Sequence, residues 1–200
     1  MLSAIVSETY SNKWRLIPVS MPTFCSRAIA YLKPTTKDVG PTVSLPRPGS
    51  PVLQVINEDL LVAYLVDMGD HFEYVQHWHL EQEGMSADEL HGVAVSNLQN
   101  LAEERLVVRE YGPIHVALMG GNFEASLLLV HSMWSAWYAH LVKNTYMVAA
   151  PARDILAFCD ASSTDGVAEL RQVIQRVQNC DHRLHPHLYR RSGLEWHTIE

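Results

Sequence analysis

The feature that most constrains the fold is a pattern that occurs three times from Leu60 onward. In each round, two short apolar runs flank a turn sequence and are followed by a segment with helical periodicity. The first round has apolar runs at 61–66 and 71–75, separated by a turn sequence at 67–70. Short apolar runs around a turn are typical of β-hairpins. We therefore expect strands that pair antiparallel and helices that pack on them.

The helix that follows the first hairpin has a start signal. Ser86 and Glu89 have the spacing of a capping box, in which each side chain accepts a hydrogen bond from the other residue's backbone N–H. Apolar residues then repeat at helical intervals, namely Leu90, Ala94, Leu98 and Leu101. We expect an amphipathic helix that begins just after Ser86.

The two later rounds occupy the second half of the chain. We expect a helix over 123–142, capped by Asn122, and a helix over about 165–178. The apolar runs that precede them lie at 106–108, 114–118, 145–149 and 155–159. Successive hairpin-then-helix units predict an α+β fold, with a mainly antiparallel sheet and helices packed on it, rather than a doubly wound parallel sheet.

The first fifty residues differ from the rest because they are rich in proline. Proline fixes φ and lacks a backbone N–H, so the segment 33–51 indicates an irregular arm. A chain of 200 residues can form one well-filled core. We expect an N-terminal element and proline-rich arm over 1–51, followed by a single α+β domain over 52–200.

Charge and cysteine content favour some partners and compartments over others. The chain has 15 Lys and Arg against 22 Asp and Glu, a formal charge of −7, which repels nucleic acid and anionic membranes and attracts a basic partner. Three cysteines at wide spacings, Cys25, Cys159 and Cys180, match neither a disulfide framework nor a zinc knuckle. The charged and then apolar pattern expected of a secretory leader does not follow Met1, which also favours an intracellular protein. We expect a cytoplasmic protein with a protein partner, without nucleic-acid or membrane partners.

Several short stretches of sequence between about Leu61 and Arg191 are similar to stretches of a known family and follow in the same order. They lie at 64–69, 85–90, 97–98, 122–126 and 147–156. Together they resemble the YtpQ-like family of uncharacterised bacterial proteins. The resemblance implies a strand, an exposed turn and a returning strand at 147–156. It implies no reaction, because the family has no established activity.

The densest group of metal-ligating residue types lies within 67–79. Imidazoles and carboxylates are ligands for zinc or another transition metal. The candidate ligands are Asp67, His71, His77 and His79. His77 and His79 would share a face on a strand but diverge on a helix. Because the spacing fits no metal motif of defined geometry, the alternative interpretation is a hairpin turn at 67–70 with histidines that lie on a solvated edge or cap the start of a helix.

A second group of ligating residue types lies near the C-terminal end. It comprises Cys180, His182, His185 and His187. Pro186 among them favours a loop over a metal site. The basic residues of this stretch are Arg183, Arg190 and Arg191, and we interpret them as a solvated tail or a local anion contact.

The candidate partner-binding residues are Glu124, Arg153 and Asp154. Arg153 and Asp154 form an expected turn between strands, where binding residues often collect. Glu124 would share a helix face with His131, which would place an acid and a base together. The alternative is that Glu124 only stabilises the start of its helix.

No common catalytic motif is present: the nucleophile elbow, the phosphate-binding glycine loop and the His-Glu-x-x-His motif are all missing. The sequence therefore predicts a non-catalytic protein-interaction module, such as an adaptor or an immunity-type neutraliser of a basic partner. The alternative is a metal-dependent hydrolase in which zinc on the Asp67, His71, His77 and His79 cluster activates water.

Overall fold

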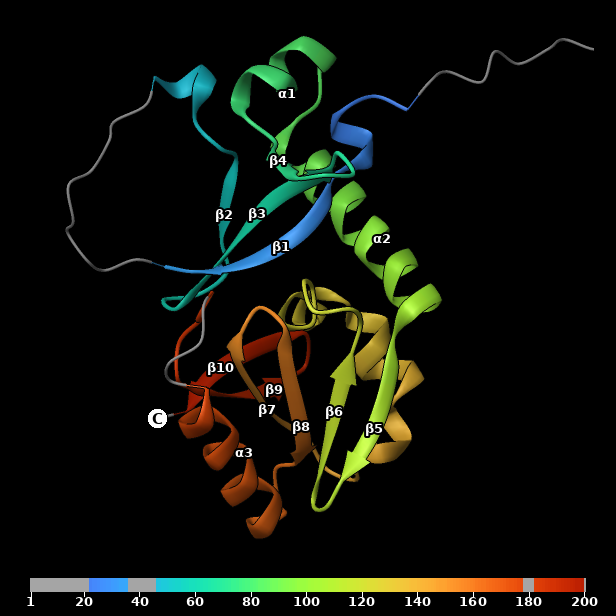
Figure 1. The fold of residues 1–200 in the computed structure, drawn as a ribbon, viewed down its shortest axis with the longest axis vertical. Helices are drawn as coiled ribbons and strands as arrows, with labels where there is room; N and C mark the ends of the chain where they lie inside the picture. Colours follow the sequence, from blue (N-terminus) through green and yellow to red (C-terminus); the bar gives the residue numbers. More distant parts are fainter. Residues whose placement is uncertain (1–21, 36–45, 178–181, 200) are drawn as a thin grey trace, which may run out of the picture.

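The structure is a computed structural model that describes residues 22–35, 46–177 and 182–199. These residues form two lobes arranged one above the other along the longest axis (Figure 1). Each lobe is built on its own antiparallel sheet. The predicted α+β class, with antiparallel sheet and packed helices, is confirmed.

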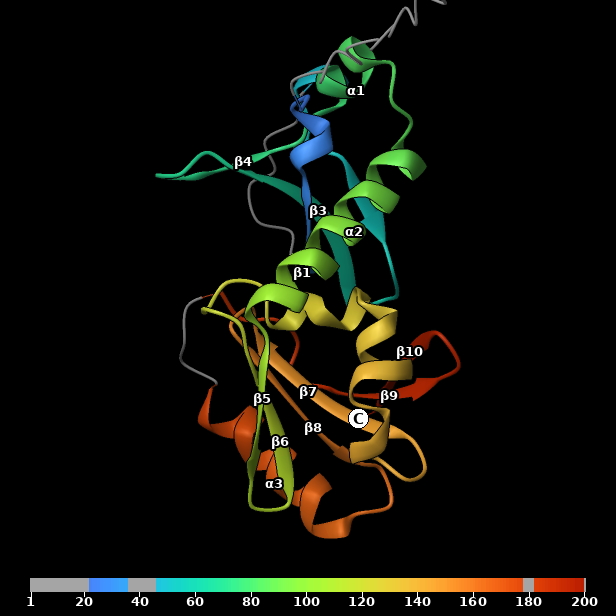
Figure 2. The same ribbon diagram turned by 90° about the vertical axis from the view of Figure 1, so that its right-hand side faces the viewer.

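The upper lobe contains a four-stranded sheet in which β3 is central. β1 pairs along one edge of β3, and β2 and β4 pair along the other. The β3–β4 hairpin projects sideways from the lobe (Figure 2). The elements are η1 (Cys25–Arg27), β1 (Ile29–Pro34), η2 (Arg47–Gly49), β2 (Leu53–Val55), β3 (Leu60–Asp67), β4 (Phe72–Tyr74), α1 (His77–Glu83) and α2 (Ala87–Arg105).

The lower lobe contains a six-stranded sheet in the order β10-β9-β7-β8-β6-β5. Helix α3 covers one face, and three short helical turns cover the other (Figures 1 and 2). The elements are β5 (Val107–Tyr111), β6 (Ile114–Leu118), η3 (Ala125–Leu129), η4 (Met133–Trp137), η5 (Ala139–Leu141), β7 (Tyr146–Ala152), β8 (Ile155–Asp160), α3 (Thr164–Arg176), β9 (Leu188–Ser192) and β10 (Glu195–Ile199).

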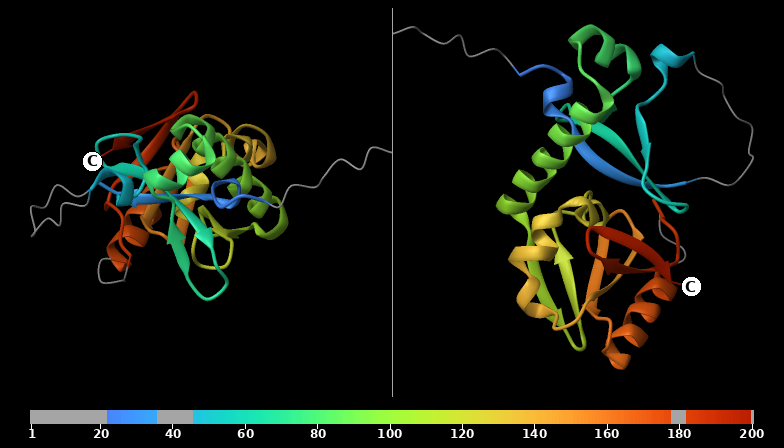
Figure 3. Two further views of the ribbon diagram at one scale, coloured as in Figure 1. Left: turned by 90° about the horizontal axis from the view of Figure 1, so that it is seen from above. Right: turned by 180° about the vertical axis from the view of Figure 1, so that it is seen from behind.

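The predicted start of α2 is confirmed. The Ser86 hydroxyl accepts a hydrogen bond from the Glu89 N–H, and the Glu89 carboxylate accepts one from the Ser86 N–H, as in a capping box. Asn97 of α2 donates hydrogen bonds to the carbonyl oxygens of Ser26 and Ala28 at 2.9 and 2.8 Å. Helix α2 therefore holds the chain that enters β1, and then leads directly into the lower lobe (Figure 3).

The long helix expected over 123–142 is wrong: η3, η4 and η5 replace it. The backbone leaves the helical region at Val130. Two indole N–H groups bind carbonyl oxygens of this segment, Trp134 to Leu127 and Trp196 to Leu128, each at 2.9 Å. Tertiary contacts thus satisfy groups that a continuous helix would use internally. Among the described residues, no helix combines the length and apolar character needed to cross a bilayer.

The expectation of a solvated basic tail is also wrong. Residues 188–199 form the hairpin β9–β10, and β9 pairs with β7 to extend the lower sheet. Tyr189 is fully buried and Arg191 is 9% exposed, whereas Arg190 is exposed. Alternation along a strand therefore sends these two arginines to opposite faces.

Part of the proline-rich N-terminal region belongs to the upper sheet. β1 pairs with β3 along its whole length, from Ile29 opposite Leu65 to Pro34 opposite Leu60. Residues 1–21 and 36–45 lie outside the described residues. The division into 1–51 and 52–200 stays a prediction.

A buried carboxylate connects the two lobes. Asp59, in the loop between β2 and β3, is 2% exposed. It accepts hydrogen bonds from His187 Nδ1 at 2.8 Å and from the Thr198 hydroxyl at 2.9 Å, both in the lower lobe. Burial acts to raise the pKa of Asp59, but these hydrogen bonds, together with the electrostatic effect of His187 and His185, outweigh it and hold the pKa below its ordinary value. We call Asp59, His187 and Thr198 the interlobe clasp.

The second histidine group takes part in this junction. The rings of His185 and His187 stack with centroids 5.8 Å apart, and His185 Nε2 lies 3.2 Å from the carbonyl oxygen of Thr35. Because His187 is bound to Asp59, it serves the junction between the lobes. Cys180, the other candidate ligand of this group, lies outside the described residues.

Two helical glycines test how tightly α3 packs. A Cβ on Gly166 would lie 2.8 Å from the Cβ of Cys159 in β8, whereas a Cβ on Gly92 of α2 would meet no atom within 4 Å. We expect Gly166→Ala to lower the free energy of unfolding by about 1–3 kcal/mol through overpacking. Gly92→Ala should raise it by about 0.5–1 kcal/mol through helix propensity. Urea unfolding of both variants measures this, and equal effects would contradict the packing of α3.

The clasp predicts a pH-dependent loss of stability. Asp59→Asn should lower the free energy of unfolding by about 3 kcal/mol at neutral pH, because it removes a buried charge from its partners. The folded pKa of Asp59 is lowered. Its contribution is therefore complete above the unfolded value, about pH 4, and is lost as the pH falls through the folded value.

The matched control is Asp70→Asn, since Asp70 pairs with His71 at 2.7 Å on the open surface. That variant should change stability little. Urea unfolding at pH 7 and pH 3 compares the two. An Asp59→Asn effect as small as that of the control at pH 7 would refute the clasp.

Candidate functional site

A cleft of about 450 Å³ lies at the junction of the two lobes. The upper lobe contributes Tyr31, Lys33, Phe72 and Tyr74, and the lower lobe contributes Asn122, Arg153, His182 and Arg183. We call this space the interlobe cleft. Its walls come from both lobes, so its shape depends on how the lobes are joined.

Strand alternation places the upper wall. In β1 the side chains of Ala30 and Leu32 are buried in the core, while those of Tyr31 and Lys33 take the other face and line the cleft. The Leu32 N–H donates a hydrogen bond of 2.9 Å to the Ser126 hydroxyl in the lower lobe. The outer edge of β1 is thereby held against the lower lobe.

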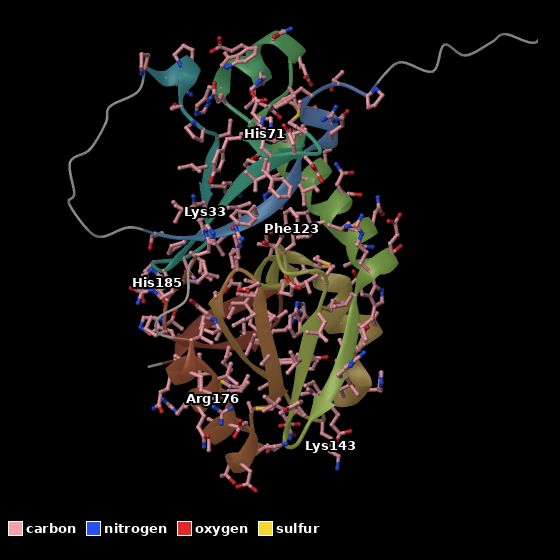
Figure 4. All side chains as sticks on the ribbon, in the orientation of Figure 1. Lys33, His71, Phe123, Lys143, Arg176 and His185 are labelled. Carbon is pink, nitrogen blue, oxygen red and sulfur yellow. The ribbon has the colours of Figure 1, made fainter. Side chains whose placement is uncertain are left out.

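Aromatic rings meet beside the cleft. Phe123 of the lower lobe makes edge-to-face contacts with Tyr31 and Phe72, with ring centroids 5.8 and 5.6 Å apart. Figure 4 shows Phe123 at the junction of the lobes, with Lys33 on the strand above it. Edge-to-face pairs of this kind are stabilising and fix the rings in place.

Backbone hydrogen bonds hold the lower wall. The carbonyl oxygen of Arg153 accepts from the Ala125 N–H at 3.0 Å, and the Arg153 N–H donates to the His182 carbonyl oxygen at 3.3 Å. Ala152 forms an isolated bridge with Arg183. Three separate segments of sequence, carrying Asn122, Arg153 and Arg183, are thus fixed beside one another.

The charge of the cleft is opposite to that of the whole chain. Lys33, Arg153 and Arg183 line it, and its lining among the described residues contains neither Asp nor Glu. The Lys33 ammonium donates to the Tyr74 hydroxyl at 2.8 Å, which leaves two more N–H groups on that nitrogen to donate. The chain carries a formal charge of −7, so the cleft is a local positive region in an acidic protein.

His182 adds backbone strain at the edge of the cleft. Its φ is +60°, and it is the one non-glycine residue with positive φ in the described part of the chain. A left-handed conformation of this kind costs roughly 1–2 kcal/mol for a residue with a Cβ. Such strain often occurs where a segment is positioned for binding.

The three candidate partner-binding residues have different positions. Arg153 lines the cleft, and Asp154 is exposed in the β7–β8 turn. Glu124 is 2% exposed, and its Oε1 accepts hydrogen bonds from the backbone N–H groups of Met119 and Gly121, each at 2.7 Å. It therefore supports the loop that carries Asn122. The helix that would have placed His131 on the same face as Glu124 is not formed.

The four candidate metal ligands do not converge. Asp67 accepts a hydrogen bond from the Gly69 N–H, and His71 is exposed and pairs with Asp70. His77 and His79 lie in α1, where neighbouring side chains diverge. Within the ranges that the structure describes, no group of three or more His, Cys, Asp or Glu residues is placed to hold a metal ion.

Lys33, Tyr74 and Asn122 line the cleft although they are not among the candidate site residues of the sequence. The signal is weak, because Lys33 stands at the start of the proline-rich segment, whose composition indicates an irregular arm. Alternation of Tyr31 and Lys33 with apolar neighbours is the pattern that would have revealed a strand with one polar face.

Comparison with known proteins gives one informative similarity. No protein-family model matches the chain, and no solved structure matches it. The chain is 31% identical to the UPF0354 protein BH3252 of Halalkalibacterium halodurans over 113 residues, which are 56% of this chain and 42% of that protein. It thus spans less than half the length of this curated relative. The similarity is to a protein of an uncharacterised family, and assignment to the YtpQ-like family stays a prediction.

Proposed function

We propose that this chain is a non-catalytic binding module whose interlobe cleft holds an anionic group of its ligand. The observation that carries the proposal is that Lys33 and Arg153 line a cleft together with aromatic side chains, and that the described lining contains no carboxylate. Ammonium and guanidinium groups form strong, charge-assisted hydrogen bonds with carboxylates and phosphates. The ligand is therefore one that presents either group.

The size and chemistry of the cleft suit such a ligand. A volume of about 450 Å³ lies within the range of sites for small molecules or for one anchoring side chain. Phe72 and Tyr74 offer apolar surface beside the cations. A positive cleft with low-dielectric walls concentrates the field on an incoming anion.

Two observations favour a binding role over a hydrolytic one. The candidate ligands Asp67, His71, His77 and His79 do not converge. Burial raises the pKa of the Cys159 thiol to about 11, so this cysteine is not a thiolate at neutral pH.

The lining of the cleft predicts which basic side chains contribute to binding of an anionic ligand. Lys33→Ala and Arg153→Ala should each weaken binding of a fluorescein-labelled glutamate-rich peptide, measured by fluorescence polarisation, by about tenfold. The control is Lys143→Ala, because Lys143 lies at the far end of the lower lobe (Figure 4). That variant has the same change in net charge and should bind as the unmodified chain does.

Inorganic phosphate as a competitor separates two sources of the anion. Binding of peptide and its displacement by phosphate indicate an acidic protein segment, whereas binding of phosphate alone indicates a small anion. If neither probe binds, or if Lys143→Ala weakens binding as much as Arg153→Ala, the proposal is refuted.

A further inference from the structure

A second pocket, of about 550 Å³, lies at the upper end of the molecule between η1, β4 and α1. Its chemistry is opposite to that of the interlobe cleft. Phe72 and Tyr74 line the cleft, whereas Glu73, between them in β4, lines this pocket. Strand alternation thus separates the two sites. We call it the acidic aromatic pocket.

Three aromatic rings in contact form one wall of this pocket, and we call them the ring stack. The ring of His79 stacks on that of Phe24, with centroids 4.1 Å apart, and contacts that of Trp78, which is tilted by 32°, with centroids 3.7 Å apart. Trp78 is 41% exposed, and its indole N–H donates a hydrogen bond of 2.6 Å to the Gln76 side chain. A large exposed ring is therefore held in a fixed orientation at the surface, which is how an aromatic anchor is prepared for binding.

The central histidine of the stack serves as an uncharged ring. His79 is 5% exposed, and burial lowers its pKa even though the carboxylates of Glu73 and Glu83 act to raise it. Its Nδ1 accepts a hydrogen bond from the Gln76 N–H at 3.0 Å. At neutral pH the stack therefore presents an aromatic wall without a positive charge of its own.

Two carboxylates adjoin the stack. Burial acts to raise the pKa of Glu83, but hydrogen bonds from the Thr23 hydroxyl and the backbone N–H groups of Cys25 and Phe24 hold it below its ordinary value, so the group is ionised. Glu73 is half-buried on the neighbouring strand. The described lining of the pocket contains neither Lys nor Arg.

We infer that the acidic aromatic pocket binds an arginine side chain presented by a protein partner. A guanidinium stacks on an indole through cation–π attraction and forms paired hydrogen bonds with a carboxylate. The formal charge of −7 attracts a partner that presents such a residue. This inference does not rest on the anion site, because the two pockets share no lining residue.

The test uses the full chain and two small probes, N-acetyl-arginine methylamide and its neutral citrulline counterpart. The indole N–H resonance of Trp78 is assigned with a Trp78→Phe variant and followed in two-dimensional ¹H–¹⁵N spectra. We expect the arginine probe to shift this resonance in a saturable way and the citrulline probe to leave it in place. An unmoved resonance, or equal shifts with both probes, overturns the inference.

Matched variants then locate the contact. Glu73→Gln should weaken binding of the arginine probe by roughly tenfold. Glu104→Gln makes the same change in charge at an exposed position of α2 and should leave the affinity unchanged. Circular dichroism checks that both variants fold. Equal loss in both variants would show attraction to net charge in place of a pocket, and would also overturn the inference.

Discussion

The arrangement of the two lobes depends on the hydrogen bonds that the buried carboxylate of Asp59 accepts. A charge at this depth is tolerated only with partners, and both partners, His187 and Thr198, come from the opposite lobe. Around the clasp, one continuous apolar core includes residues of both sheets. The interlobe cleft has walls from both lobes, so the clasp and the shared core together set its width.

The distribution of charge follows from the geometry of a single short strand. In β4, Phe72 and Tyr74 turn toward the positive cleft while Glu73 turns toward the acidic aromatic pocket. A strand needs only two residues to present opposite chemistry on its two faces. The proposed anion site and the proposed arginine site thereby lie on opposite faces of this strand.

The sequence predicts features that are local and misses those that depend on distant contacts. The hairpins and the Ser86 capping box are local, and the structure contains them. The helix expected over 123–142 is not formed, and the indole N–H of Trp196, 68 residues from Leu128, binds the carbonyl oxygen of Leu128 in this segment. The cleft was missed because Lys33 and Arg153 belong to different lobes. The β9–β10 hairpin has a local signal in the sequence, which is the glycine at 193. In the structure Gly193 takes a φ of +61° in the two-residue turn of this hairpin.

The measurement that tests the central claim most directly is a phosphate titration of the ¹⁵N-labelled chain followed by backbone chemical shifts. An anion held in the interlobe cleft should shift the amide resonances of Lys33, Asn122 and Arg153 together, with one dissociation constant. The amide resonances of Trp78 and Lys143 should stay in place. Shifts that are spread over the surface, or that avoid the cleft, would contradict an anion site between the lobes.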